Sequence, residues 1–434
     1  MAIVETHPAF RLAEKHFKNR STAALPALRG LPSSLCLPLL DLARPAEEDD
    51  DSVWRAGWWS NVYTSEVPKP GKSRKRRNSR AVSNEPARGD RPELELDGMK
   101  RVFLADGKEG FLVAEGCVLV PGYLDVEQQK AFLLAALAEY TLSPNPKSLD
   151  THYSLPPSLF HAYSTTPDLL ISPKHLTLDE SERNARSQAA EVNKGPRTLI
   201  ETAPASKLGY DEVKRRNATW TGDDMSLKLN SKTAEALMKE LRWANLGRVY
   251  QWSTKTYDFT ARGNIAFPQD LEDVCRRIVS DTPWGEVYAN VQEDAVPKFS
   301  TWPEDYKPDT GIVNYYQKND TLMAHVDRSE LDPARPLVSI SLGHSAIFLL
   351  GTDSREDPPR PLILRSGDVL IMSGRGRQAY HGVPRIMEGT HAPHFLEADD
   401  DSIEMRAAKR WVANARININ ARQVFPPGFT VNDA

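Results

Sequence analysis

A mainly β domain of the jelly-roll or barrel type is predicted for the C-terminal half of this 434-residue chain. From residue 243 to residue 425, short apolar stretches alternate with Pro, Gly and Asp. Stretches of this length, bounded by turn residues, are typical of strands, and a domain with many of them folds as a double sheet or a barrel. Eight strands are expected, at 311–316, 321–326, 337–342, 346–350, 362–365, 368–372, 379–383 and 416–422.

Helices are expected mainly ahead of this β domain. Apolar residues recur with helical spacing at 9–17, 126–140 and 234–241. One further strand is expected at 117–120, where the chain then turns at Pro121 and Gly122. The whole chain is therefore predicted to be α+β, with a mainly β core and flanking helices.

The distribution of polar and Pro-rich sequence divides the chain into five parts. Residues 1–65 form an N-terminal extension with a short helix, and 66–98 form a basic linker. Residues 99–242 form a helical and irregular extension, 243–425 the β domain, and 426–434 a tail. We expect the N-terminal segments around the linker to be disordered, because they hold too few apolar residues to build a core.

The linker contains a run at 69–80 with seven basic residues and no acidic one. This run is either a solvated linker or a functional element, namely a nuclear address or an arm that binds phosphate. The chain as a whole has 55 basic and 59 acidic residues, a net charge of −4. That balance excludes a histone-like polycation, so any binding of nucleic acid must depend on a local patch.

Cysteine use and targeting signals indicate where the protein works. The three cysteines Cys36, Cys117 and Cys275 are far apart, which excludes a disulfide scaffold and a zinc ribbon and favours a reducing compartment. No stretch approaches the roughly 18–20 apolar residues of a membrane span, and the N-terminus lacks a secretory signal. We therefore expect the cytoplasm and/or the nucleus. A mitochondrial transit peptide is the less favoured alternative, because Glu5 and Glu14 lie in the candidate region.

The candidate metal site begins with His325 and Asp327. Residues two apart on a strand point to the same face, so these two side chains can bind one ion. A third ligand from a distant strand would complete the set of two histidines and one carboxylate that holds Fe(II) and leaves coordination positions open. Such a pair also arises by chance on exposed strands, so it needs support from other residues.

His381 is the preferred third ligand. It follows the apolar strand expected at 368–372 and a Gly-rich turn, which places it in a strand-like context. The competing candidates are less suitable, because His391 and His394 lie in a Pro-containing loop and His344 lies at a hairpin beside Gly343.

Polar side chains line one face of two other strands. Alternation places Arg416, Asn418 and Arg422 on the same face of 416–422. If that face is buried, its arginines need an anionic ligand, and a carboxylate held by two parallel hydrogen bonds fits best. The alternative is a solvated edge strand. Asn314 and Tyr316 share a face of 311–316 and offer an amide and a phenol to the same ligand.

Together these motifs resemble the AlkB family of Fe(II)/2-oxoglutarate-dependent dioxygenases, and most closely its eukaryotic AlkB homologue one branch. The family shows an Asn-x-Tyr strand, a His-x-Asp pair eleven residues after the Asn, a distal His and an Arg-x-Asn-x-x-x-Arg strand in this order. Asn314, His325, His381 and Arg416 open these four elements here. The resemblance extends over about 243–425.

The resemblance implies a jelly-roll core of the double-stranded β-helix type and three roles for the residues above. Fe(II) is bound by His325, Asp327 and His381, and O2 takes an open position on it. The co-substrate 2-oxoglutarate is bound by Asn314, Tyr316, Arg416, Asn418 and Arg422. Its distal carboxylate pairs with Arg416, whereas Asn418 and Arg422 lie near its chelating end.

The resemblance also implies a methylated nucleic acid as substrate. The N-methyl carbon is hydroxylated and leaves as formaldehyde, while 2-oxoglutarate becomes succinate. A base extruded from its helix is expected to stack on aromatic residues, and the candidates are Trp243, Tyr250, Trp252 and Tyr257, which could also be ordinary core or surface aromatics. Bacterial members carry a second Asp in the pocket where this chain has Ser329, so a pairing of that carboxylate with a cationic base is not expected.

Among nucleic acids, methylated tRNA is favoured over DNA. The alternatives are a DNA demethylase that repairs alkylation damage, and a protein hydroxylase or demethylase that uses the same metal site. A non-catalytic binding module is less favoured, because the three ligands and the arginine strand are intact. The sequence makes no prediction about oligomeric state.

Overall fold

The computed structural model describes residues 7–18, 36–37, 40, 42, 100–173, 230–248, 250–251, 256–257, 265–327 and 330–425. The basic linker 66–98, the tail 426–434 and most of the N-terminal extension lie outside these residues. The expected disorder of the N-terminal segments therefore stays a prediction.

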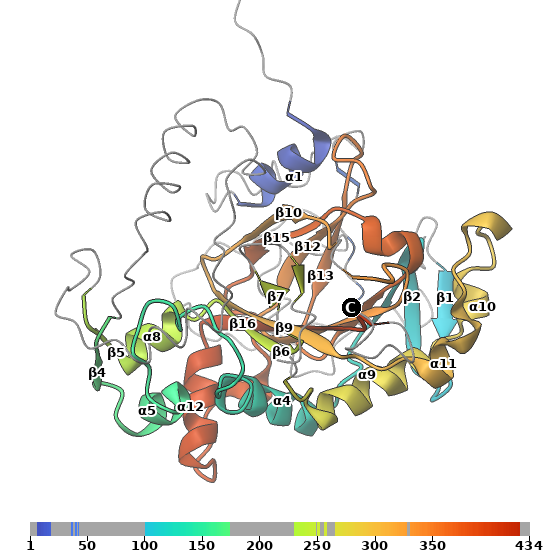
Figure 1. Cartoon of the computed structure of the whole chain (residues 1–434). Helices are drawn as coiled ribbons and strands as arrows, with labels where there is room; N and C mark the ends of the chain where they lie inside the picture. Colours follow the sequence, from blue (N-terminus) through green and yellow to red (C-terminus); the bar gives the residue numbers. More distant parts are fainter. Residues whose placement is uncertain are drawn as a thin grey trace, which may run out of the picture.

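Two antiparallel sheets form the core of the molecule (Figure 1). The large sheet has the strand order β1-β2-β3-β14-β11-β16-β9-β6, and the small sheet has the order β10-β15-β12-β13. The strands of the large sheet are β1 (Lys100–Phe103), β2 (Glu109–Ala114), β3 (Cys117–Val120), β14 (Val369–Met372), β11 (Leu337–Gly343), β16 (Ala415–Arg422), β9 (Thr310–Gln317) and β6 (Trp243–Gly247). Those of the small sheet are β10 (Leu322–His325), β15 (His381–Ile386), β12 (Ala346–Leu350) and β13 (Arg360–Leu364).

All eight strands expected in the β domain are present, and the mainly β fold class with flanking helices is confirmed. The largest difference is at β15, which begins and ends later than expected, at His381 and Ile386. The inner faces of the two sheets pack against each other through a shared apolar core. Leu370 and Met372 contribute from the large sheet, and Phe348 and Val383 from the small one. This arrangement is the double-sheet jelly roll.

Helices cover the outer face of the large sheet (Figure 1). They are α4 (Val126–Ala138), α5 (Leu159–Thr165), α8 (Ala234–Glu240), α9 (Gln269–Asp281), α10 (Trp284–Val287), α11 (Trp302–Asp305) and α12 (Ile403–Val412). α4 begins where the Asp125 side chain accepts the backbone N–H of Gln128 and the Gln128 side chain accepts that of Asp125, a capping box. The helices expected at 126–140 and 234–241 are thus confirmed as α4 and α8.

Four helices, α9 to α12, lie in the region where the sequence predicted only strands and turns, and α9 and α12 are the longer two. α9 buries Leu271, Cys275 and Ile278, which are spaced four and three residues apart and so share one helical face. Its polar residues obscured this pattern in the sequence. α12 follows the short 3₁₀ helix η7 (Pro393–Phe395), whose Phe395 is buried against the same core.

The N-terminal parts of the chain are built into the jelly roll. β3 pairs with β14, so residues 100–120 extend the large sheet of the expected domain 243–425. On the opposite side of the molecule, α1 (Ala9–Lys18) packs on the outer face of the small sheet (Figure 1). Segments far apart in the sequence thus share one sheet. The five-part domain division stays a prediction.

Shorter elements complete the described chain. β4 (Leu170–Ile171) pairs with β5 (Lys232–Thr233), and β7 (Tyr250–Gln251) pairs with β8 (Thr256–Tyr257). The remaining 3₁₀ helices are η4 (Glu293–Ala295), η5 (Phe299–Thr301) and η6 (Gly374–Gln378). None of the helices among the described residues has the length and apolar character needed to cross a membrane.

Candidate active site

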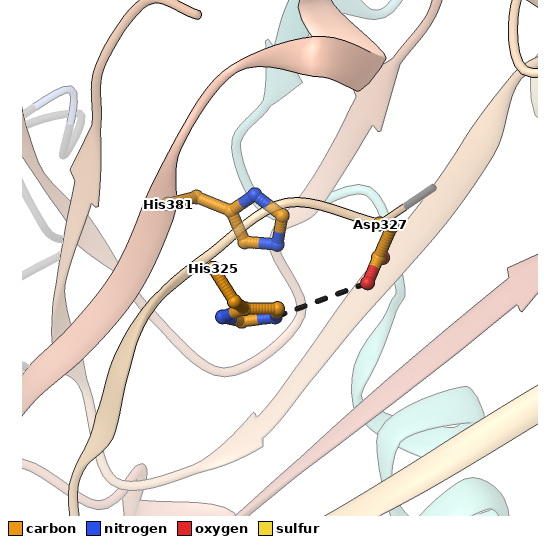
Figure 2. A group of neighbouring side chains, drawn as sticks. All are labelled: His325, Asp327 and His381. Carbon is orange, nitrogen blue, oxygen red and sulfur yellow. Dashed lines mark ion pairs between the residues drawn. The ribbon is translucent and has the colours of Figure 1, made fainter. Parts of the chain in front are cut away.

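The side chains of His325, Asp327 and His381 meet at the edge of the small sheet (Figure 2). His325 is the last residue of β10 and His381 the first of β15, and the two are opposite each other in the ladder. Asp327 follows two residues after His325, just past the end of β10. One ligand atom from each residue lies within 4.8 Å of the other two, and the imidazole centroids are 4.3 Å apart.

Each histidine has one ring nitrogen occupied and the other available. Nδ1 of His325 lies 2.9 Å from the carbonyl oxygen of Met323, and Nδ1 of His381 lies 3.0 Å from that of Ala379. A carbonyl only accepts, so Nδ1 carries the hydrogen in both rings and Nε2 keeps its lone pair for a metal. Burial, together with the nearby His325, lowers the pKa of His381 to about 4. His381 is therefore neutral at pH 7, as metal binding requires.

Asp327 is half-buried and belongs to a chain of charges whose other members are buried. Burial by itself would raise the pKa of Asp327, but the Arg422 guanidinium, 3.0 Å away, and the two imidazoles outweigh burial and hold that pKa well below its usual range. Arg422 also lies 2.9 Å from Glu330, which in turn lies 2.8 Å from Arg377. The expectation that both arginines of β16 need an anionic ligand is thus wrong for Arg422, because carboxylates of the chain balance it.

Sequence reasoning missed Glu330 and Arg377. Both are buried: Glu330 comes three residues after Asp327, and Arg377 lies in the Gly-rich η6 ahead of His381. Their pairing could not be predicted, because it joins residues far apart in the chain. The one available signal was an acidic residue three positions after Asp327.

Arg416 makes no comparable ion pair among the described residues. It is 1% exposed and donates to the carbonyl oxygens of His344 and Leu364 and to Oγ of Ser341. Among the described residues no carboxylate lies within ion-pair distance of Arg416, and neither its Nε nor the buried hydroxyl of Tyr316 has a hydrogen-bond partner. Burial lowers the pKa of Arg416 to about 10, so it stays cationic at pH 7. An unpaired guanidinium beside a free phenol suits a carboxylate ligand.

The sheet register places the other expected residues around this position. Tyr316 is opposite Arg416 and Asn314 is opposite Asn418, so all four side chains share the inner face of the large sheet. Trp243 on β6 is opposite Asn314 and extends the same row. Asn418 donates from Nδ2 to Oγ of Ser339, at 2.8 Å, and to the carbonyl of Ile340, at 3.0 Å.

The other histidine candidates do not join the site. His344 is buried, with Nδ1 near the Met387 carbonyl and Nε2 near that of Ala413, and its ring contacts His391. The His394 ring contacts the Gln129 side chain instead. Among the described residues, the only group of three or more His, Cys, Asp or Glu side chains placed to hold an ion is the one around His325.

Comparison with known proteins decides the family. Residues 198–422 match the model of the 2OG-Fe(II) oxygenase superfamily. The tRNA demethylase abh1 of Schizosaccharomyces pombe is 32% identical over 66% of this chain and 89% of its own length. The chain belongs to the AlkB family of this superfamily.

Other AlkB-family relatives have similar coverage. The DNA N(6)-methyladenine demethylase ALKBH1A of Arabidopsis thaliana is 30% identical over 75% of this chain and 78% of its own. The nucleic acid dioxygenase ALKBH1 of Homo sapiens is 29% identical over 70% of this chain and 68% of its own. Among solved structures, that of OsALKBH1 aligns with 72% of this chain and 99% of its own, at 19% identity and a TM-score of 0.37.

The site fits the two groups that an AlkB-family dioxygenase uses. Two imidazoles with available Nε2 atoms and one ionised carboxylate are the ligand set of Fe(II) in such enzymes, and the cluster supplies them. The guanidinium of Arg416 and the hydroxyl of Tyr316, both without the partners they need, fit the distal carboxylate of 2-oxoglutarate. The specific ligand roles remain predictions.

The expected substrate-binding aromatics are only partly placed. Tyr250 and Tyr257 are opposite each other in the β7–β8 ladder. Trp252 and Ser329 lie outside the described residues, as do the side chains of the two tyrosines. Contacts of these residues with a base therefore stay a prediction.

Proposed function

We propose that this chain removes methyl groups from nucleic-acid bases by oxidation, using Fe(II), 2-oxoglutarate and O2, and that methylated tRNA is its preferred substrate. The observation that carries the proposal is the pairing of a three-residue metal cluster with a buried arginine, Arg416, that makes no ion pair among the described residues. Family membership and the relatives that act on tRNA and DNA support the choice of nucleic acid.

Different residues bind the metal and the co-substrate in the proposed reaction. His325, Asp327 and His381 would hold the metal, and Arg422 keeps Asp327 ionised. Arg416 and Tyr316 bind the distal carboxylate of 2-oxoglutarate. When bound, Fe(II) and 2-oxoglutarate activate O2, so that the methyl C–H is hydroxylated, 2-oxoglutarate becomes succinate and CO2, and the hydroxymethyl group leaves as formaldehyde.

A DNA demethylase is the second candidate, because one of the relatives is a DNA N(6)-methyladenine demethylase. The basic run at 69–80 is compatible with either nucleic acid. Both proposals place the protein in the cytoplasm and/or the nucleus.

The test measures formaldehyde release with Fe(II) and 2-oxoglutarate across a panel: tRNA with 1-methyladenine, DNA with 6-methyladenine, alkylated DNA and a methylated peptide. We expect the highest rate on tRNA. A higher rate on DNA would favour the second candidate, and release from the peptide alone would contradict both. His325→Ala should abolish release on every substrate, whereas His161→Ala, an exposed histidine on α5, should leave it unchanged.

A further inference from the structure

The strand that carries His325 is weakly held by its own sheet. β10 is the edge strand of the small sheet, and β15 is its one neighbour there. The two strands pair at Leu322 with Val383 and at His325 with His381, and the register shifts between these pairs. Ala324 lies within the irregular stretch, immediately before His325. Backbone groups in such a stretch lack a regular ladder partner, so something else must hold them.

One contact to Ala324 comes from the N-terminal helix. Phe10, Ala13 and Phe17 of α1 pack on the outer face of the small sheet, in a cluster that also includes Ala324. Glu14 lies on the same buried face of α1 and is only 2% exposed. Its Oε1 accepts the backbone N–H of Ala324 at 2.7 Å, across 310 residues of sequence.

The carbonyl of Ala324 is held as well. Nη2 of Arg355 donates to it at 3.3 Å, and the same guanidinium lies 4.6 Å from the ring centroid of Tyr380. The backbone N–H of Phe10 donates to the Arg355 carbonyl at 3.0 Å, which ties this loop to α1. Ala324 directly precedes His325, and Tyr380 directly precedes His381.

We propose that Glu14 and Arg355 are positioning residues of the metal site. From outside the small sheet they hold the backbone of Ala324 and the ring of Tyr380, and so set the spacing between His325 and His381. The inference rests on the proposed metal site but not on the substrate. A charged acceptor on a backbone N–H is among the stronger hydrogen bonds in proteins. Ligands must be held within about 0.5 Å for tight binding, and loss of their supporting residues weakens metal affinity about 10- to 100-fold.

The experiment measures the Kd of Mn(II) alone for the full-length protein, from the electron paramagnetic resonance signal of the free ion. Glu14→Ala should raise this Kd at least about tenfold. Glu14→Gln should retain most of the affinity, because the amide oxygen can still accept the N–H of Ala324. Arg355→Ala should also raise the Kd. Glu14 also pairs with Arg11, three residues before it, at 2.9 Å. The control is therefore Glu127→Ala on α4, because Glu127 pairs in the same way with Lys130, and this variant should leave the Kd unchanged.

Hydrogen exchange of the metal-free protein gives a second readout. Glu14→Ala should speed exchange of the Ala324 amide while the amides of β16 exchange as before. If Glu14→Ala does not fold, the Mn(II) Kd of Arg355→Ala tests the proposal instead. This variant should fold, because Arg355 is exposed and outside the core. A Kd unchanged in the folded variants would overturn the positioning roles. Failure of the wild-type protein to bind Mn(II) would instead refute the metal site itself.

Discussion

Arg416 and Arg422 lie on the same face of β16, yet their charges are balanced differently. Arg422 contacts the carboxylates of Asp327 and Glu330, whereas Arg416 contacts only neutral oxygen atoms. Burial lowers the pKa of Arg416 and the charge of Asp368 counteracts this in part, but Asp368 forms no ion pair with Arg416. A buried cation without an ion pair is costly to the folded protein. Binding of an anionic ligand would offset this cost, so in the proposed function Arg416 contributes to the affinity for 2-oxoglutarate.

Arg416→Lys tests this assignment. Lysine keeps the positive charge but loses the planar fork that binds a carboxylate through two hydrogen bonds. We expect the Kd of 2-oxoglutarate, measured by calorimetry with Mn(II) present, to rise by at least about tenfold, or about 1.4 kcal/mol. Arg410→Lys, an exposed arginine of α12, serves as the control. Equal affinity in both variants would refute the role of Arg416.

Glu330→Gln tests the buried charge network. Arg377 and Arg422 outweigh burial and lower the pKa of Glu330, so its charge stabilises the fold above the unfolded-state pKa of about 4.3 and this stabilisation is lost as pH falls through the folded-state pKa. The variant leaves Arg377 without its carboxylate. We expect the free energy of unfolding in urea to drop by about 3–5 kcal/mol at pH 7 and by less at pH 4 or below. The same drop at both pH values would contradict the ionic role.

At the scale of elements, the site depends on how closely β10 and β15 approach. The strands and their alternation were predictable, because a period of two is written locally in the sequence. The irregular register between Leu322 and His325 was not predictable, since it depends on what β15 and α1 present to β10. Gly382 is central to this approach, directly after His381.

Gly382→Ala tests the approach. A Cβ there would lie 2.9 Å from the carbonyl oxygen of Leu322 and 3.2 Å from the Ala324 nitrogen, so the β10 backbone would have to shift. We expect a loss of about 1–3 kcal/mol in the free energy of unfolding and weaker Mn(II) binding. Gly285→Ala on α10 is the control, because a Cβ there would meet no atom within 4 Å. Normal Mn(II) binding by Gly382→Ala would show that the close approach does not shape the site.

At the scale of the whole molecule, the jelly roll lies between two helical layers of different size. The large sheet is covered by the helices of the main apolar core, and the small sheet by α1 alone among the described helices (Figure 1). The metal cluster belongs to the small sheet, with one histidine on β10 and the other on β15. An ion bound there would connect these two strands, so we expect it to stabilise the folded chain.

Metal linkage tests that expectation. An ion that binds only the folded protein adds about 2.7 kcal/mol to the free energy of unfolding at 100 times its Kd. We expect Mn(II) to raise the Tm of the wild-type protein and a chelator to reverse the rise. His325→Ala should show no response to Mn(II), while His161→Ala should respond as the wild type does. A response retained in His325→Ala would place the ion elsewhere.

The sequence by itself determined the strand pattern of the jelly roll, the family and the three residues of the candidate metal cluster. The strands follow from the alternation of residues along the chain, and the family and the metal cluster follow from short motifs whose residues stand at fixed spacing. Both kinds of pattern can be recognised within a short stretch of sequence. Only the tertiary structure decided which charged groups meet: Arg422 and Arg377 contact Glu330, Glu14 contacts the backbone of Ala324, and Arg416 makes no ion pair with any carboxylate of the described chain. Such contacts join distant segments, because the energy of a buried charge depends on its neighbours in space.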